Sequence, residues 1–389
     1  MSFLQKLYAL WVSINRTLIK TPIWLFLSLP PFRPRKSWDW RKAYNVRLVR
    51  FNNSSGLPST DPDHRAIKGG LPAEVSANWV EPANPSHIVG ELSEFAKFAK
   101  VETCRIPAYW YHLPKQPLLG DSPPVSPDEK IILAFHGGGY RILSAHPSSS
   151  CQSQTRDTLT AVSKKTSNIK RILSLEYRLT TDTSNPFPAA LLDAVSGYSY
   201  LVNTIGFKPE NIVLMGDSAG GHLAINLARY LVRNPECGLK PPGGVIAQCP
   251  WADMGTSQRG PGTSSEKNLE SDFMVRETYV AAKAFVAPRS WEAVNASPDP
   301  YLMPGSKYIS AEKAKGIFEG FPKTFVTAGG GEILYDGIVT MVERMKADMG
   351  ERVTFYEGKD AVHVFCAFDW AQPEKSEAYD KIGDWFVKL

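Results

Sequence analysis

The chain has 389 residues, of which 43% are hydrophobic and 21% are charged, so it suits one large globular domain or two small ones. Its net charge of +5 is unevenly distributed, because residues 1–50 hold ten Lys and Arg against the single acid Asp39. The rest of the chain is therefore net acidic, which argues against a nucleic-acid partner. Five cysteines without a C-x-x-C pair predict neither a disulfide framework nor a zinc site.

The N-terminus carries an amphipathic pattern. Over residues 3–20, apolar side chains recur every three or four positions, as in a helix with one apolar face: Leu4, Leu7, Trp11, Ile14 and Leu18. The apolar run at 23–29 is too short to cross a bilayer, which needs about 20 residues. Two alternatives stay open for residues 1–45: a segment on a membrane surface, with peripheral contact through residues 1–40, or a helix that caps a substrate pocket.

The next part of the chain has weaker signals. Residues 52–100 mix Pro, Gly, Ser and Asn, and we expect an irregular preamble with one helical patch at Glu91–Lys100. Alternating apolar residues predict a strand over Arg105–His112. The Pro and Ser content of residues 120–128 predicts a loop.

From Lys130 onward, short apolar runs alternate with helical patterns. Strands are predicted at 131–135, 172–177, 211–216, 243–251, 324–328 and 352–357, and helices at 188–203, after 328 to about Met349, and at 374–389. This alternation predicts an α/β fold, with a mostly parallel central sheet covered by helices on both faces. The main domain is expected over residues 46–389, with residues 252–320 inserted as a cap over the carboxyl ends of the strands.

The stretch GDSAGGHL at 216–223 joins an apolar strand to a helical pattern through a sharp turn. Ser218 lies at its tip, which is typical of a nucleophile elbow. Glycines suit this turn because strand and helix backbones approach closely there. Since G-x-S-x-G alone also occurs by chance, the role of Ser218 depends on whether the chain supplies a base, an acid and an oxyanion hole.

A glycine loop precedes the elbow. Gly137, Gly138 and Gly139 follow the buried strand at 131–135 and His136. Consecutive glycines expose backbone N–H groups that can bind the oxyanion of a tetrahedral intermediate. With the amide of Ala219, they form the predicted oxyanion hole. The alternative is a flexible turn without a catalytic role.

The base and the acid are sought after the elbow, in the chain order Ser, acid, His. His363 is the only histidine C-terminal to the elbow helix, and imidazole titrates in the range that a general base needs. His222 lies only four residues after Ser218 and is expected to pack or cap there. Two acids are candidates: Glu332 directly follows the strand at 324–328 and is favoured, while Asp336 lies about one helical turn further on.

These motifs together resemble the hormone-sensitive-lipase-like, or fold-3, branch of the α/β-hydrolase family, and within it the fungal-type esterases. The resemblance covers about residues 130–389 and rests on HGGGY (136–140), EYRL (176–179), GDSAGGHLA (216–224), CPWADM (249–254), EILYDG (332–337) and HVFCAF (363–368). It implies an α/β-hydrolase fold with a cap made partly from the N-terminus. It also implies a serine-dependent carboxylester hydrolase with the triad Ser218, Glu332 and His363, although the acid of this family is most often Asp.

The expected substrate is a small lipophilic ester, with a short or medium acyl group on an alcohol such as a sterol or a secondary metabolite. The apolar N-terminus and the inserted segment favour this choice. One alternative is the same triad acting on an amide or a lactone, or in acyl transfer. Another is a non-catalytic receptor on a hydrolase scaffold, as in the plant gibberellin receptors, which lack the catalytic histidine. Neither a metal nor an organic cofactor is implied, and the oligomeric state stays open.

Overall fold

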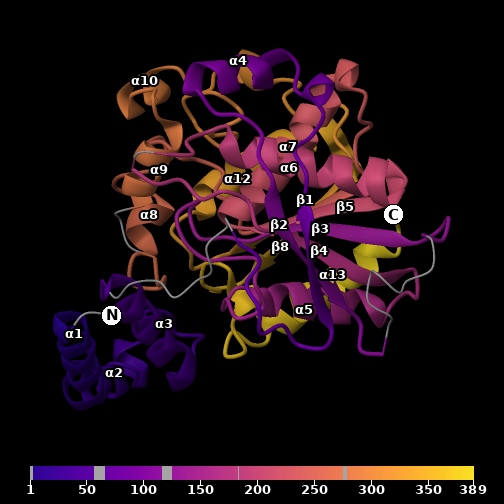
Figure 1. Ribbon diagram of the computed structural model, residues 1–389. Helices are drawn as coiled ribbons and strands as arrows, with labels where there is room; N and C mark the ends of the chain where they lie inside the picture. The colour runs from indigo at the N-terminus through magenta and orange to yellow at the C-terminus, as the bar shows by residue number, and fades with distance from the viewer. Residues whose placement is uncertain (1–2, 57–65, 116–124, 183, 275–277) are drawn as a thin grey trace.

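The computed structural model describes residues 3–56, 66–115, 125–182, 184–274 and 278–389. Its centre is an eight-stranded sheet in the order β1-β2-β4-β3-β5-β6-β7-β8 (Figure 1). The strands are β1 Val75–Val80, β2 Ile106–His112, β3 Lys130–Phe135, β4 Ile169–Leu175, β5 Ile212–Asp217, β6 Gly244–Gln248, β7 Lys323–Gly329 and β8 Val353–Gly358.

Strand directions confirm the predicted α/β fold. β2 is antiparallel to both of its neighbours, β1 and β4, and the strands from β4 to β8 along the sheet are parallel. The central strands β5 and β6 are buried along their whole length, as their unbroken apolar runs predict for a sheet covered on both faces.

Helices cover the two faces of the sheet. On one face lie α6 (Ala189–Ser199), α7 (Ala219–Arg233) and α12 (Tyr335–Met349), and on the other lie α5 (Gln152–Ser163) and α13 (Glu374–Phe386) (Figure 1). A π-helical turn, Tyr200–Ile205, continues α6 to just beyond residue 203, where the sequence predicts that helix to end. The inserted segment forms the short helices α8 (Ser264–Lys267), α9 (Thr278–Val286), α10 (Trp291–Ala296) and α11 (Ala311–Ala314).

The N-terminal segment is helical for longer than the sequence predicts. α1 (Phe3–Ile14) continues through a π-helical turn, Asn15–Lys20, into α2 (Thr21–Phe26). Pro22 follows the π-helical turn directly, where the regular ladder is already altered and the Thr21 amide bonds to the Arg16 carbonyl five residues back. Within the described residues, no helix combines the length and the apolar character needed to cross a membrane.

The predicted boundary at residue 45 falls inside α3 (Trp40–Ser54), which is one continuous helix. The carboxylate of Asp39 starts this helix by accepting a hydrogen bond of 2.7 Å from the Lys42 amide. The first 54 residues therefore contain one more helix than was expected, and it joins the segment to the rest of the molecule.

The preamble predicted as irregular contains α4 (Gly90–Ala99), as expected, and also the edge strand β1, which was not expected. Apolar and polar residues alternate from Val75 to Trp79, so a short strand pattern is present within the Pro- and Gly-rich preamble, and β2 supplies the antiparallel ladder. The predicted strand at 172–177 begins earlier, at Ile169. Residues 120–124 of the loop predicted at 120–128 lie outside the described residues, and so do residues 57–65 of the preamble.

Candidate active site

Ser218 occupies the sharp turn between β5 and α7. Its backbone has φ +52° and ψ −116°, a conformation that is strained for any residue with a side chain. Two hydrogen bonds of 2.9 Å hold the turn, from the Ser218 amide to the Gln248 carbonyl and from the Trp251 amide to the Ser218 carbonyl. A Cβ on Gly220 would lie 2.0 Å from the Phe135 carbonyl oxygen, so only glycine lets α7 approach β3 this closely. The geometry is that of the predicted elbow.

Three predicted side chains meet at the carboxyl ends of the strands. The Nε2 atom of His363, in the loop after β8, lies 2.9 Å from the Ser218 hydroxyl oxygen. The Nδ1 atom of the same ring lies 3.0 Å from Oε2 of Glu332, in the loop after β7. All three residues are buried. They form one chain of hydrogen bonds, acid to imidazole to hydroxyl.

The other candidates lie elsewhere. Asp336 accepts a 2.8 Å hydrogen bond from the Ser264 amide at the start of α8, and its own amide donates to the Ser264 hydroxyl at 3.1 Å. The structure thus brings Glu332, and not Asp336, to His363. His222 is fully buried with its Nδ1 2.7 Å from the Tyr140 hydroxyl, and burial lowers its pKa to about 3. It therefore packs as a neutral ring, in agreement with the expectation.

Burial and charge act in opposite directions on the buried imidazole. Burial by itself lowers the pKa of His363, but the hydrogen bond and the charge of Glu332 outweigh it, with smaller contributions from Asp272 and Asp217. The net effect is a pKa for His363 above its ordinary value of 6.5. Burial raises the pKa of Glu332, and the bond to His363 opposes that rise. The acid thus makes the imidazole a stronger base.

The glycine loop lies beside Ser218. Gly138 and Gly139 have φ of +102° and +62°, a left-handed conformation that favours glycine. In the part of the chain that the structure describes, the amides of Gly138, Gly139 and Ala219 donate to no other protein group. The amide of Gly137 differs, because it donates a 3.0 Å hydrogen bond to the Asp217 carboxylate. Gly137 thus ties the loop to the elbow, and its N–H is not free for an oxyanion.

Comparisons with known proteins bear on this geometry. A family model described as alpha/beta hydrolase fold matches residues 132–367, which is more than half of the chain. The chain belongs to the α/β-hydrolase fold family. The matched residues include all of the predicted site, from the glycine loop to His363.

Relatives of this α/β-hydrolase carry esterase names. An acetyl-hydrolase of Streptomyces hygroscopicus is 27% identical over 260 residues, covering 67% of this chain and 76% of its own. Steryl acetyl hydrolase 1 of Saccharomyces cerevisiae is 32% identical over 148 residues, covering 37% of this chain and 30% of its own. A solved esterase of the bacterial hormone-sensitive lipase family superposes with a TM-score of 0.60 at 24% identity, over 90% of this chain and 99% of its own.

These matches confirm two predictions. The solved structures support the resemblance to hormone-sensitive-lipase-like proteins at the level of the fold. The family match, together with relatives named as esterases, confirms that the chain is a carboxylester hydrolase.

A cavity of about 390 Å³ opens above Ser218 and His363. Its wall comes from the glycine loop, the elbow, the inserted segment and α3. The lining is mostly apolar and includes Val49, Ile142, Leu143, Trp251, Phe273, Met274, Ala281, Val364 and Phe368. Such a lining suits an apolar ligand with one polar group directed at the elbow. The predicted insertion contributes to this wall, and so do Val49 and Asn53 of α3, which lie beyond the N-terminal segment predicted at 1–45.

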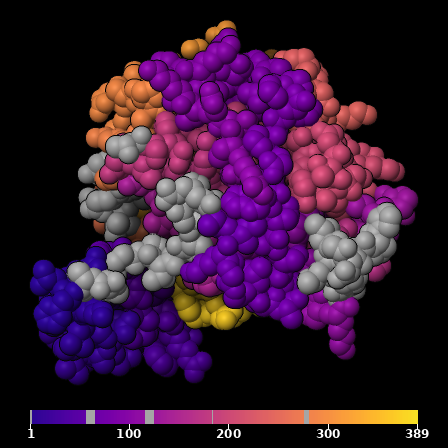
Figure 2. All heavy atoms as spheres, viewed as in Figure 1, coloured from indigo at the N-terminus to yellow at the C-terminus, as the bar shows by residue number. Residues whose placement is uncertain are grey.

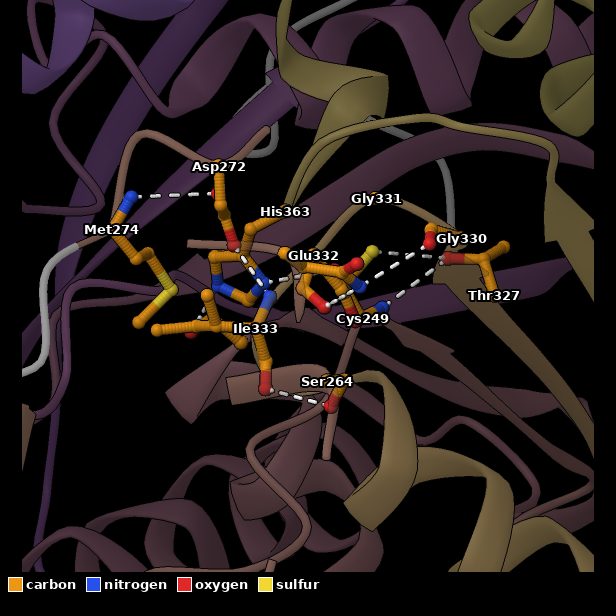
Figure 3. A network of polar contacts seen from close by, with 12 residues as sticks. Cys249, Ser264, Asp272, Met274, Thr327, Gly330, Gly331, Glu332, Ile333 and His363 are labelled. Carbon is orange, nitrogen blue, oxygen red and sulfur yellow. Dashed lines mark hydrogen bonds and ion pairs between the residues drawn. The ribbon is translucent and has the colours of Figure 1, made fainter. Parts of the chain in front are cut away.

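Sequence reasoning missed a buried acid beside the triad. Asp272, from the inserted segment, is fully buried and accepts hydrogen bonds from the amides of Ile333 at 2.8 Å and Met274 at 3.4 Å (Figure 3). Since Ile333 follows Glu332 directly, the Asp272 carboxylate holds the loop that carries Glu332. No sequence pattern marks Asp272, because its role depends on a contact across 61 residues.

A cysteine also lies next to the triad. One ligating atom each from Cys249, Glu332 and His363 fall within 4.8 Å of one another (Figure 3). Metal-binding cysteines are thiolates, whereas burial raises the pKa of the Cys249 thiol well above its usual value. Glu332 and His363 already bind each other. The group therefore fits a triad beside a neutral thiol better than it fits a metal site. Cys249 and Cys366 are both buried, as expected for core residues.

Proposed function

We propose that this protein hydrolyses carboxylic esters through an acyl-enzyme formed on Ser218. The observation that carries the proposal is the continuous chain of hydrogen bonds from Glu332 through His363 to the Ser218 hydroxyl, at the floor of an apolar cavity. His363 takes the hydroxyl proton as Ser218 attacks the ester carbonyl, and then gives it to the departing alcohol. Water hydrolyses the acyl-enzyme by the same route. Glu332 orients the ring and stabilises the imidazolium.

The tetrahedral intermediate needs donors for its oxyanion. We assign this role to the amides of Gly138, Gly139 and Ala219, which have no protein partner among the described residues. One such donor contributes about 2.7–4 kcal/mol to transition-state stabilisation. The predicted contribution of Gly137 becomes indirect, since its amide holds the loop against Asp217. α7 begins at Ala219, and the positive end of its dipole adds to the same effect.

The substrate we propose is a short- or medium-chain acyl ester of a lipophilic alcohol. Support comes from the apolar wall of the cavity and from its volume of about 390 Å³. The relatives named acetyl-hydrolase and steryl acetyl hydrolase favour a small acyl group. Hydrolysis of an amide or a lactone, or acyl transfer, would use the same serine, and analysis of the products distinguishes these reactions.

The test compares wild-type protein with Ser218→Ala on p-nitrophenyl acetate and on a lipophilic acetate such as cholesteryl acetate. We expect the variant to lose roughly a million-fold in kcat, as removal of a nucleophile does. Ser297→Ala, at an exposed serine, is the matched control and should retain full activity. A fluorophosphonate probe should label wild type and not Ser218→Ala. Equal rates for wild type and Ser218→Ala would overturn the role of Ser218, and no labelling of wild type would support a non-catalytic receptor instead.

A further inference from the structure

The N-terminal helices expose an unusual amount of apolar surface. Of the twenty large hydrophobic residues that are exposed in the described chain, fifteen lie between residues 3 and 40. They are Phe3, Leu4, Leu7, Tyr8, Leu10, Trp11, Ile14, Leu18, Ile19, Ile23, Leu25, Phe26, Leu29, Phe32 and Trp40. Single exposed hydrophobic residues are ordinary, whereas a contiguous group of this size marks an interaction surface. We call residues 3–32 the N-terminal lobe.

The lobe contacts the rest of the molecule through a small part of its surface. Trp24 is buried and packs edge-on against Tyr44 and Phe51 of α3, with ring centroids 6.2 Å and 5.4 Å away. The Tyr8 hydroxyl donates to the Ser55 carbonyl just after α3. Figure 1 and Figure 2 show α1 and α2, in indigo, projecting at one corner of the molecule. Val12 is the one buried residue of α1, so most of the apolar side chains of this helix face solvent.

The charges of the lobe indicate what covers it. Residues 1–38 contain no acid, and Lys6, Arg16 and Lys20 lie in the lobe among its apolar side chains. Tyr and Trp side chains are also present, and they favour the boundary between lipid and water. A second copy of the chain would bring like charges together, whereas an anionic bilayer offers both an apolar interior and opposite charge.

We propose that the N-terminal lobe docks this protein on the surface of an anionic membrane, with its apolar side chains inserted among the lipids. The helices lie on the bilayer and do not cross it. Lys6, Arg16 and Lys20 contact the headgroups, and Trp24 stays buried against α3. This docking does not require catalysis.

The lobe and the cavity share one helix. α3 holds Trp24 through Tyr44 and Phe51, and it also lines the cavity with Val49 and Asn53. Because a helix with its side chains is about 10 Å wide, docking would place the cavity close to the bilayer surface. A lipophilic ester dissolved in the membrane would then be concentrated beside the site, a consequence that rests on the proposed function.

The binding test uses full-length Ser218→Ala protein, so that turnover does not alter the vesicles. Flotation is measured with phosphatidylcholine vesicles containing 30% phosphatidylserine and with phosphatidylcholine alone. We expect binding that is at least tenfold stronger to the anionic vesicles and that weakens with salt. The variant Phe3→Ser/Leu4→Ser/Leu18→Ser changes three of the most exposed apolar residues of the lobe and should lose at least tenfold in binding.

The matched control is Phe98→Ser/Tyr308→Ser/Val387→Ser, which removes three exposed apolar residues from the rest of the molecule and should bind as before. The proposal is overturned if the parent protein binds neither vesicle, or if both triple variants lose binding equally. Sedimentation of the parent protein as a dimer that the lobe variant alone disrupts, without vesicle binding, would assign the surface to a second copy.

An activity measurement separates this proposal from the proposed function. In an otherwise wild-type chain, the lobe variant should hydrolyse soluble p-nitrophenyl acetate at an unchanged rate and an acetate ester embedded in anionic vesicles at least tenfold more slowly. Delivery from the membrane would be contradicted if the lobe variant lost vesicle binding but hydrolysed each substrate at the same rate as the parent protein. Absence of hydrolysis by the parent protein would contradict the proposed function and leave the binding result unaffected.

Discussion

At the scale of single residues, the proposed reaction depends on the protonation state of His363. The ring accepts the Ser218 proton only when it is neutral, and Glu332 raises its pKa above 6.5. Protonation therefore sets in at a higher pH than for a free imidazole. We expect kcat/KM to fall as the pH drops through this raised pKa, so that the acid limb of the profile has its midpoint above pH 6.5. A midpoint below 6.5 would contradict the assignment.

The variant Glu332→Gln tests the cause of this shift. Without the carboxylate the pKa of His363 should fall, so the acid limb should move to lower pH. The plateau of kcat should drop by roughly 100- to 10,000-fold, because the imidazolium loses its stabilising charge. Asp336→Asn is the matched control and should leave the acid limb in place, since Asp336 binds Ser264. If Asp336→Asn moved the limb and Glu332→Gln did not, the acid would be misassigned.

Gly220 is the residue on which the elbow depends sterically. A methyl group there would lie 2.0 Å from the Phe135 carbonyl oxygen, and backbone cannot move aside cheaply. We expect Gly220→Ala to lower the free energy of unfolding by about 3 kcal/mol, the upper part of the usual range for overpacking. Urea denaturation measures this. The control Gly69→Ala has no atom within 4 Å of its added Cβ and should change stability little.

At the scale of elements, α3 is linked to the loop that supports the triad. The guanidinium of Arg50 donates to the carbonyls of Leu269 and Asp272, and the Asp272 carboxylate in turn binds the amide of Ile333, next to Glu332. This path runs from the N-terminal helices through the inserted segment to the acid. The segment predicted as either a cap or a membrane surface also reaches these loops directly, because the Trp38 indole donates to the Asp360 carbonyl at 2.8 Å and Arg35 donates to Asn268 and Ser271. Most of α1 and α2 faces solvent.

Arg50→Ala removes this link. We expect kcat to fall on the order of tenfold with little change in the free energy of unfolding, because small displacements of a catalytic group are costly in rate. Steady-state kinetics alongside thermal unfolding separate the two effects. Arg41→Ala, on the same helix but exposed, should have wild-type kinetics. An Arg50→Ala enzyme with unchanged kcat would show that the loop keeps its position without α3.

At the scale of the whole molecule, the two ends of the chain are joined. The ammonium group of Lys42, on α3, lies 2.8 Å from a carboxylate oxygen of Glu374 at the start of α13, and it also donates to the Gln372 carbonyl. Both side chains are largely buried. Removing one partner of a buried pair leaves the other charge uncompensated.

We expect Lys42→Ala to lower the free energy of unfolding by about 3 kcal/mol. Chemical denaturation followed by fluorescence measures this loss. Lys36→Ala, at an exposed lysine, is the control and should stay within about 0.5 kcal/mol of wild type. A similar small effect for both variants would mean that α3 and α13 are held together by their apolar contacts alone.

Elements with a local cause can be predicted from the sequence alone. The apolar runs of β3, β5 and β6 predict buried parallel strands, and the glycines at 216 and 220 predict the tight turn around Ser218. Chain order singled out His363, because parallel strands bring their carboxyl ends to one edge of the sheet. Backbone sterics and hydrophobic burial set these features within a few residues.

Other features depend on contacts between segments that lie far apart in the chain. α3 is held by α13 and by the inserted segment, and the Gly137 amide is taken by Asp217. Glu332 rather than Asp336 faces His363, although both follow the same strand, because one turn of α12 directs Asp336 toward α8. Hydrogen bonds and packing across tens or hundreds of residues leave no local pattern, so these features become visible only in the folded chain.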